Sequence, residues 1–160
     1  MLKDVLKILE NDARTSARQI ATMTGVPAGE VSKLIKQAEK DKLILKYKTI
    51  VNWDKIEDDQ VWAIIEVRVK PEPEAGFDAI AGRIAQYGQV RSLYLASGTY
   101  DLLMVVMGKS ERKVADFVSE NLAHIEGVQG TVTHFVLKRY KVDGEILEGG
   151  EGVKRQPVIL

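Results

Sequence analysis

The stretch Ser97–Met107, SGTYDLLMVVM, places hydroxyl groups and one carboxylate directly before a run of apolar residues. The apolar run predicts a buried strand, and Asp101 stands at its mouth. Its carboxylate suits three roles: a catalytic acid or base, a hydrogen-bonding group for a ligand, or a solubilising surface charge. A fourth, purely structural role is the acceptance of hydrogen bonds from N–H groups of the turn. The rest of the chain has to decide between these roles.

Catalysis and metal binding lack the necessary side chains. The chain has no cysteine, and its histidines are His124, near a predicted helix end, and His134, in a predicted strand. It has no motif of paired carboxylates. The glycine-rich residues 149–152 follow the last predicted strand and open no helix, unlike a phosphate-binding loop. We therefore predict no catalytic residue, no metal site and no cofactor, and a protein that is not an enzyme.

The composition is that of a globular protein, with 45% hydrophobic residues in a chain of 160. The absence of cysteine fits a reducing compartment. The start, MLKDVLKILEND, carries acids among its apolar positions, which is unlike a signal peptide. No apolar run reaches the roughly 20 residues of a membrane helix. We expect a soluble, cytoplasmic protein without a membrane partner.

The net charge of zero conceals an asymmetry along the chain. Residues 1–55 hold 11 Lys and Arg against 7 Asp and Glu, a net charge of +4. Residues 56–160 hold 12 against 16, a net charge of −4. A basic first part joined to an acidic remainder predicts two modules with different partners.

The first module, residues 1–57, reads as three short helices. Apolar residues from Leu2 to Leu9 recur at the spacing of one helix face, and Asn11-Asp12 ends that run. Ser16 and Gln19 have the spacing of a capping box for a second helix, whose predicted buried side is Ile20 and Met23. Gly25 is expected to end that helix and Pro27 to open a third.

The third helix has two different sides. Val31, Leu34, Ile35 and Ala38 fall on the apolar side, and lysines fall on the other. Three helices with a tight glycine-containing turn between the second and third predict a helix-turn-helix. Residues 43–53, LILKYKTIVNW, are expected to form strands of a wing, with Leu43 and Ile44 packed inward.

A helix-turn-helix of this kind predicts a partner, double-stranded DNA. The third helix would enter the major groove, and the wing would reach the phosphate backbone. Six lysines lie within residues 33–48 against Glu39 and Asp41, which favours DNA over a merely solvated surface. Glu30, near the start of the helix, would repel phosphate unless it accepts from a cytosine amino group. The predicted DNA-binding residues are Ser32, Lys33, Lys36, Gln37, Lys40, Lys46 and Lys48.

The second module, residues 58–144, predicts the order strand, helix, strand, strand, helix, strand. The predicted helices lie within residues 77–88 and 111–125, and the last strand within 131–142. This order is the split βαβ or ferredoxin-like arrangement, so the whole chain is of the α+β class. Residues 145–160 are expected to form a flexible tail that docks on a neighbouring subunit through Val158–Leu160.

Two helices can cover only one face of a four-stranded sheet. The strand LLMVVM is nevertheless apolar on both faces, so the second face needs another cover. Self-association as a two-fold homodimer is the expected solution, and it would present two helix-turn-helix modules to a pseudo-palindromic site. Ferredoxin-like sheets also bind RNA through aromatic residues on central strands. The aliphatic strand after Tyr100 suits a protein–protein face better.

Together these motifs resemble the leucine-responsive regulator/asparagine-operon regulator (Lrp/AsnC) family of transcription factors. The resemblance rests on DARTSARQIATMTGVPAGEVSKLIKQAEKDKLI, VRSLYLASGTYDLLMVVM and EGVQGTVTHFVLKRYK, and it spans Leu2 to Lys141. It implies a DNA-binding regulator that associates as homodimers and as rings of dimers, such as an octamer of dimers. It also implies a small effector, commonly an amino acid, bound between dimers. The implied effector-binding residues are Ser97, Gly98, Thr99, Tyr100, Asp101, Thr131 and Thr133.

The recognition helix departs from the pattern of that family. The family usually has a hydroxyl or small polar residue near Glu30, an arginine near Leu34 and a leucine at Ala38. These departures keep a second hypothesis open. In it, the chain is a metabolite-binding regulatory and oligomerisation module with weak or no DNA binding.

Overall fold

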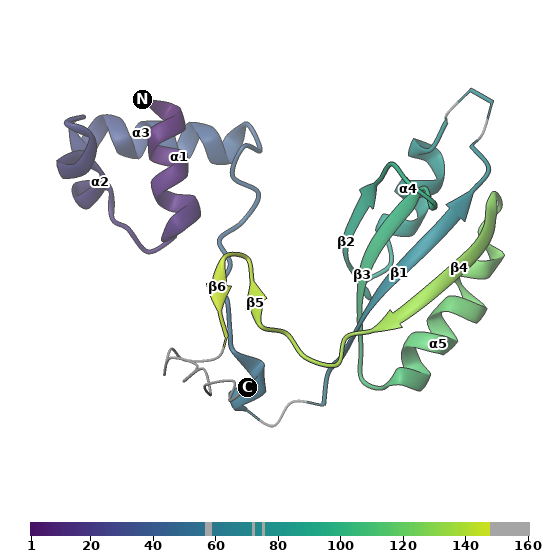
Figure 1. Cartoon of the computed structure of the whole chain (residues 1–160). Helices are drawn as coiled ribbons and strands as arrows, with labels where there is room; N and C mark the ends of the chain where they lie inside the picture. Colours follow the sequence, from purple (N-terminus) through teal and green to yellow (C-terminus); the bar gives the residue numbers. More distant parts are fainter. Residues whose placement is uncertain (57–58, 72, 75, 148–160) are drawn as a thin grey trace, which may run out of the picture. The chain divides into compact units, whose positions relative to one another are not determined.

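The computed structural model describes residues 1–56, 59–71, 73–74 and 76–147 (Figure 1). The chain folds as two compact units, residues 1–51 and residues 52–160. None of the described helices is long and apolar enough to cross a membrane. The expected docking segment Val158–Leu160 lies outside the described residues.

The first unit consists of three helices, as predicted. They are α1 (Leu2–Asn11), α2 (Ala17–Thr24) and α3 (Ala28–Lys40). The side chains that they bury against one another are Val5, Leu9, Ile20 and Val31, with Leu34, Ile35 and Ile44 packed around them. The apolar spacing along α1 and α3 thus gives the interior of a small helical domain.

The ends of α2 follow the predicted signals. The Ser16 hydroxyl accepts from the Gln19 N–H, and the Gln19 side chain accepts from the Ser16 N–H, so the capping box is present. Gly25 follows the helix with φ of +72°, a left-handed conformation that glycine adopts without steric cost. The prediction for Met23 is wrong, because its side chain is 66% exposed. The inner stripe of this short helix runs instead through Ala17, Ile20 and Ala21.

The predicted wing strands over residues 43–53 are wrong. This segment is fully traced, and it contains no strand between α3 and the short 3₁₀ helix Trp53–Lys55. A hairpin needs a tight turn, and LILKYKTIVNW has no glycine or proline at which to fold back. Ile44 packs against the helices as expected, whereas Leu43 is 58% exposed. Both of their N–H groups donate to the carbonyl of Ala38, which fixes how the chain leaves α3.

The second unit has the predicted ferredoxin-like order. Its elements are β1 (Val61–Val69), α4 (Asp78–Ala85), β2 (Val90–Leu95), β3 (Leu102–Gly108), α5 (Glu111–Glu120) and β4 (Val128–Phe135). The strands form one antiparallel sheet in the order β2-β3-β1-β4. This is the topology expected for a split βαβ arrangement (Figure 1).

Both helices pack on the same face of this sheet. Alternate residues of β1 and β3 point toward them, including Ile65, Val67 and Met104, each with no exposed surface. Ile80 and Ile84 of α4 and Val114 and Phe117 of α5 complete that interior. Leu103, Val105 and Met107 of β3 alternate with the buried positions and lie on the other face, which none of the described helices covers. We call this second surface the open face.

The C-terminal part of this unit differs from the prediction. Helix α5 ends at Glu120 rather than near residue 125, and a 3₁₀ turn (Leu122–His124) follows it. The last sheet strand begins at Val128 and ends at Phe135, earlier than the predicted 131–142. Residues 141–146 instead form a hairpin of β5 (Lys141–Val142) and β6 (Glu145–Ile146). Leu147 is buried and its carbonyl accepts from the Asn52 side chain, so residues 145–147 belong to the folded unit.

Candidate functional sites

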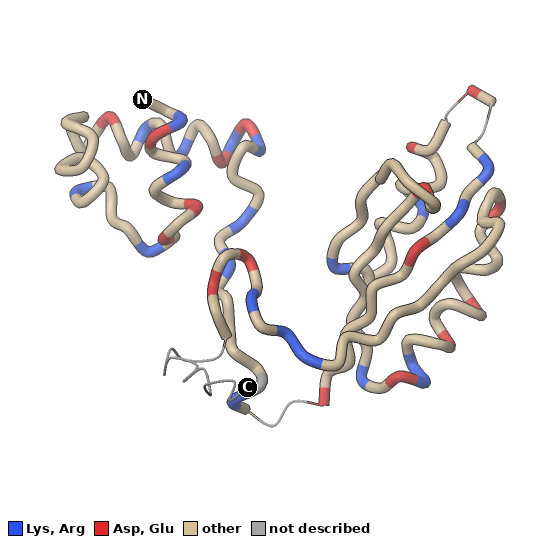
Figure 2. The backbone as a smooth tube through the Cα atoms, in the orientation of Figure 1, with Lys and Arg blue, Asp and Glu red and all other residues tan. Residues whose placement is uncertain are grey.

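The outer surface of α3 presents a row of cations. Lys33, Lys36 and Lys40 are exposed at spacings of three and four residues, which places them on one side of the helix. Val31 and Ala38 occupy the opposite, buried side. The helix therefore separates an apolar inner face from an outer face that carries these lysines. Figure 2 marks the positions of Lys and Arg along the chain in blue.

Two of the predicted DNA-binding residues have local partners. The Ser32 hydroxyl donates to the carbonyl of Ala28 at 2.9 Å, one turn earlier in α3. The Gln37 amide donates to the Asp41 carboxylate at 2.8 Å. Each side chain is thus held against its own helix, while the lysines beside them extend into solvent.

Leu34 does not lie on the outer face of α3. It packs against the buried side chains of the helical unit, together with Ile35. The family usually has an arginine near this position. Because Leu34 lies on the inner side, the absence of that arginine removes no cation from the exposed row. Glu30 is exposed in the first turn of α3, where a carboxylate interacts favourably with the helix dipole.

The segment after α3 is tied to that helix by a side-chain hydrogen bond. The Tyr47 hydroxyl donates to Glu39 Oε1 at 2.8 Å. Partial burial, and secondarily the Glu39 carboxylate, raise the pKa of the Tyr47 hydroxyl above its usual value of 10.0. Lys46 and Lys48, on either side of Tyr47, are exposed. The predicted wing lysines thus follow α3 on an extended segment rather than on strands.

The open face of the sheet is apolar, with a contact between a glutamate and a histidine within it. Leu103, Glu66 and Val132 stand side by side on β3, β1 and β4, and Val105, Ile64 and His134 form the next row. His134 Nε2 lies 3.2 Å from Glu66 Oε1. The predicted feature, a sheet with apolar residues on both faces, is present in the structure.

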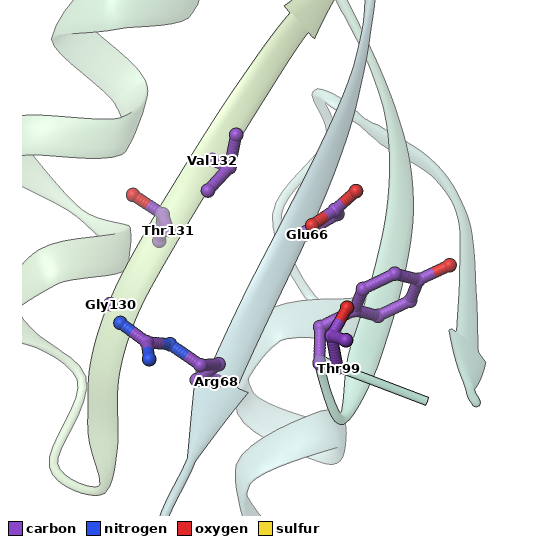
Figure 3. Close-up of a pocket in the computed structure, with 7 residues that line it drawn as sticks. Glu66, Arg68, Thr99, Gly130, Thr131 and Val132 are labelled. Atoms are coloured by element: carbon purple, nitrogen blue, oxygen red, sulfur yellow. The ribbon is translucent and has the colours of Figure 1, made fainter. Parts of the chain in front are cut away.

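A pocket of about 230 Å³ opens on this face beside the turn that precedes β3. It brings together three chain segments: Glu66 and Arg68 from β1, residues 130–132 from β4, and the turn before β3 (Figure 3). Its lining residues are Glu66, Arg68, Thr99, Tyr100, Gly130, Thr131 and Val132. Three predicted effector-binding residues, Thr99, Tyr100 and Thr131, are among them.

Asp101 holds the backbone of the neighbouring strand. Its carboxylate Oδ2 accepts from the Val69 N–H at 2.8 Å, and its own N–H donates to the Val67 carbonyl at 3.0 Å. Residue 101 does not line the pocket. This geometry favours the structural role of the carboxylate, although its donor lies on β1 and not in the turn.

The remaining predicted effector residues lie around the pocket or behind it. Ser97 and Gly98 are exposed in the turn, and Gly98 has a φ of +147° that favours glycine. Thr131 and Thr133 are paired with Val67 and Ile65, so their side chains leave β4 on the helix-covered side. Thr131 accordingly points away from Arg68 in Figure 3.

Sequence reasoning missed the two charged residues of the pocket. Both lie in the first predicted strand of the second module, where the alternation of polar and apolar residues gives no sign of a binding site. Their role becomes visible only when β4 and the turn before β3, far away in sequence, are placed beside them. The missed residues in the pocket lining are Glu66, Arg68, Gly130 and Val132.

Both units match known families. Residues 2–44 match the family described as a winged helix-turn-helix DNA-binding domain. Residues 62–146, more than half of the chain, match the family described as the Lrp/AsnC ligand binding domain. The uncharacterized HTH-type transcriptional regulator YugG of Bacillus subtilis (strain 168) is 42% identical over 153 residues, covering 95% of this chain and 92% of that protein.

Solved structures share the fold at low sequence identity. The leucine response regulatory protein LrpA of Mycobacterium tuberculosis has a TM-score of 0.73 and 18% identity, covering 92% of this chain and 97% of that one. The transcriptional regulator NMB0573 of Neisseria meningitidis, in complex with L-Met, has a TM-score of 0.68 and 20% identity, covering 88% and 90%. The chain therefore belongs to the Lrp/AsnC family of helix-turn-helix transcriptional regulators, which is not a family of enzymes.

Proposed function

We propose that this regulator binds promoter DNA through the outer face of α3 and that its second unit binds an amino acid and forms the dimer. The observation that carries the DNA part is the row Lys33, Lys36 and Lys40, exposed on a helix whose other side is buried. A helix of this kind enters the major groove with side chains toward base edges and phosphates. The expected cytoplasmic location follows from a chromosomal DNA target.

Lys46 and Lys48 extend the proposed contact beyond the helix. Their exposure after α3, and the Tyr47–Glu39 hydrogen bond between them and that helix, suit them to the DNA backbone. Phosphate contacts from such lysines position a protein on the duplex, whereas contacts to base edges specify the sequence. Ser32 and Gln37 contribute to base recognition only if DNA displaces or shares their local hydrogen bonds.

A gel-shift titration tests DNA binding directly. The full chain is titrated against its own promoter region and against an unrelated duplex of equal length. The proposal expects tighter binding to the promoter duplex. Equal, weak binding to both duplexes would instead support the alternative, a regulatory module with little DNA recognition, to which the exposed Glu30 on α3 would contribute repulsion.

The proposed effector is an amino acid in the pocket beside residues 97–101. The pocket is small, polar at Glu66, Arg68 and Thr99, and apolar at Val132, which suits a ligand of amino-acid size. The L-Met bound to the related fold of NMB0573 supports this class of ligand. A thermal-shift screen of the standard amino acids tests it, because a ligand that binds the folded state raises its stability.

The proposed assembly is a homodimer through the open face, from which rings of dimers can be built. Leu103, Val105 and Met107 offer β3 as an apolar surface that α4 and α5 do not cover. A two-fold contact there would bury these side chains and close the pocket mouth between subunits. Sedimentation velocity at micromolar concentration tests the assembly, and a stable monomer would contradict it.

A further inference from the structure

Opposite charges stand next to each other in the pocket. Glu66 and Arg68 are two positions apart on β1, so their side chains leave the same face of the sheet about 7 Å apart along the strand. Both line the pocket (Figure 3). A ligand that carries an anionic and a cationic group on neighbouring atoms complements both charges, whereas a neutral or singly charged ligand can pair with at most one of them.

We propose that Arg68 binds the carboxylate and Glu66 the ammonium group of an α-amino acid, and that Asp101 and Gly130 position Arg68 without contacting the ligand. This inference rests on the proposed effector function and adds to it the residues that recognise the ligand. It also changes the role expected for Asp101, from a ligand contact to a positioning residue.

Gly130 provides the space that the Arg68 side chain occupies. Gly130 is the β4 partner of Arg68 in the sheet. A Cβ atom added to Gly130 would lie 3.1 Å from a terminal nitrogen of the Arg68 guanidinium, closer than ordinary van der Waals contact. The guanidinium therefore lies over the bare backbone of β4, beside the pocket, where its planar fork of donors can meet a carboxylate.

Asp101 fixes the backbone of Arg68 from the other side. The Val67 carbonyl and the Val69 N–H belong to the two peptide groups that flank Arg68, and Asp101 bonds to both of them. The sheet register shifts between Arg68 and Val69, so β4 does not continue its regular pairing there. Asp101 thus holds β1 at the point where the pairing of β1 with β4, on its other side, becomes irregular.

Glu66 retains the capacity to bind an ammonium group while it contacts His134. His134 lies against one carboxylate oxygen, Oε1, and a carboxylate has a second oxygen with free lone pairs for an N–H donor. Thr99, Tyr100 and Val132 form the other lining of the pocket and would surround the ligand side chain.

Calorimetry on the full chain tests the charge recognition. The standard L-amino acids are screened first, and the one that binds most tightly is compared with its α-carboxamide, which keeps the ammonium group but has no carboxylate. We expect the amide to bind about 10- to 100-fold more weakly, as the loss of a charge-assisted bidentate contact predicts.

The variant Arg68→Gln tests whether Arg68 makes this contact. In this variant we expect the affinity for the amino acid to fall to that for the amide, so the ratio of the two affinities approaches one. The exposed Arg91, on β2 and outside the pocket, gives the matched control Arg91→Gln, which keeps the ratio.

The positioning role is tested with the same ratio. Asp101→Asn keeps an acceptor for the Val69 N–H, so it preserves both affinity and ratio, whereas Asp101→Ala reduces the ratio. Gly130→Ala also reduces it, since the guanidinium is displaced. Loss of amino-acid affinity in Asp101→Asn, with the acid-to-amide ratio unchanged, would show that Asp101 meets the ammonium group and would overturn its positioning role.

Other outcomes overturn the recognition itself. These are equal binding of acid and amide, a ratio that persists in Arg68→Gln, and no binding of any amino acid. A gel shift of the unmodified chain on its promoter DNA runs in parallel. Intact DNA binding without amino-acid binding rejects only this inference and the effector, whereas loss of both would reject the proposed function.

Discussion

The Val69 N–H donates to Asp101 Oδ2 at 2.8 Å, which joins the last residue of β1 to the residue that precedes β3. β3 begins at Leu102, so its main chain offers no regular partner to Val69. The carboxylate side chain supplies the missing acceptor and extends the ladder by one hydrogen bond. Val69 is only 4% exposed, so water does not readily replace this acceptor.

Removal of this acceptor should destabilise the second unit. Asp101→Ala leaves a buried N–H without a partner, which costs about 1–3 kcal/mol in the free energy of unfolding. Asp101→Asn should cost less, because its amide oxygen can accept. Urea denaturation followed by tryptophan fluorescence measures this unit, since both tryptophans, Trp53 and Trp62, lie within residues 52–160. The exposed Glu126 gives the control Glu126→Ala, and equal effects of the two alanine variants would contradict the role of Asp101.

Two glycines of the helical unit should respond to alanine in opposite directions. Gly25→Ala forces a side chain into a φ of +72° and should lower the stability of this unit by about 1 kcal/mol. Gly29 lies inside α3 with no atom near an added Cβ, so Gly29→Ala should raise stability by about 0.5–1 kcal/mol. Hydrogen–deuterium exchange of peptides from α1–α3 reads out this unit alone. Stabilisation by Gly25→Ala would contradict the observed turn.

The hydrogen bond from Tyr47 to Glu39 predicts an alkaline loss of stability. Because burial and Glu39 raise the pKa of Tyr47 above 10.0 in the folded state, the stabilisation is present below that pH and is lost as the pH rises through the folded pKa. An ultraviolet titration of phenolate absorbance, with Tyr47→Phe subtracted from the unmodified chain, should give a midpoint above 10.0 for this residue. The exposed Tyr140 provides the comparison Tyr140→Phe. A midpoint for Tyr47 at or below 10.0 would refute the expected effect.

A charge in the middle of the open face should break the proposed dimer. Val105 lies between Ile64 on β1 and Ser92 on β2. Val105→Glu would place a carboxylate in an apolar contact and shift the protein toward monomer in sedimentation velocity. Met23→Glu adds the same charge at an exposed position of α2 and should leave the association state unchanged. A dimer that survives Val105→Glu would point to another interface.

Local signals in the sequence predicted most of the fold. The Ser16–Gln19 capping box correctly predicted the start of α2, and Gly25 correctly predicted its end, because each signal depends on residues within one helical turn. The order of strands and helices in the second unit was likewise predicted. The wing prediction was wrong for two reasons. The segment has no glycine or proline at which a hairpin could turn, and Ile44 and Tyr47 contact the helices rather than a second strand. The Asp143-Gly144 pair, which connects β5 and β6, is a typical hairpin signal in the sequence.

The sequence predicted where the pocket lies but not most of the residues that line it. The turn from Ser97 to Asp101 was identified, and Thr99 and Tyr100 do line the pocket. Arg68 and Gly130 are ordinary strand residues until the register pairs them, so no local pattern marks them. Asp101 was singled out for its charge, and only the structure shows that Val69 is its partner.

The most direct measurement of the central proposal is the salt dependence of DNA binding by the double variant Lys33→Ala/Lys36→Ala. Each phosphate contact contributes about 0.9 to the slope of log affinity against log salt concentration. We predict that the double variant binds its promoter DNA more weakly than the unmodified chain, with a slope smaller by about 2. Lys109→Ala, an exposed lysine after β3, serves as the control and should change neither quantity. Unchanged affinity and slope in the double variant would contradict the assignment of α3 as the DNA-binding helix.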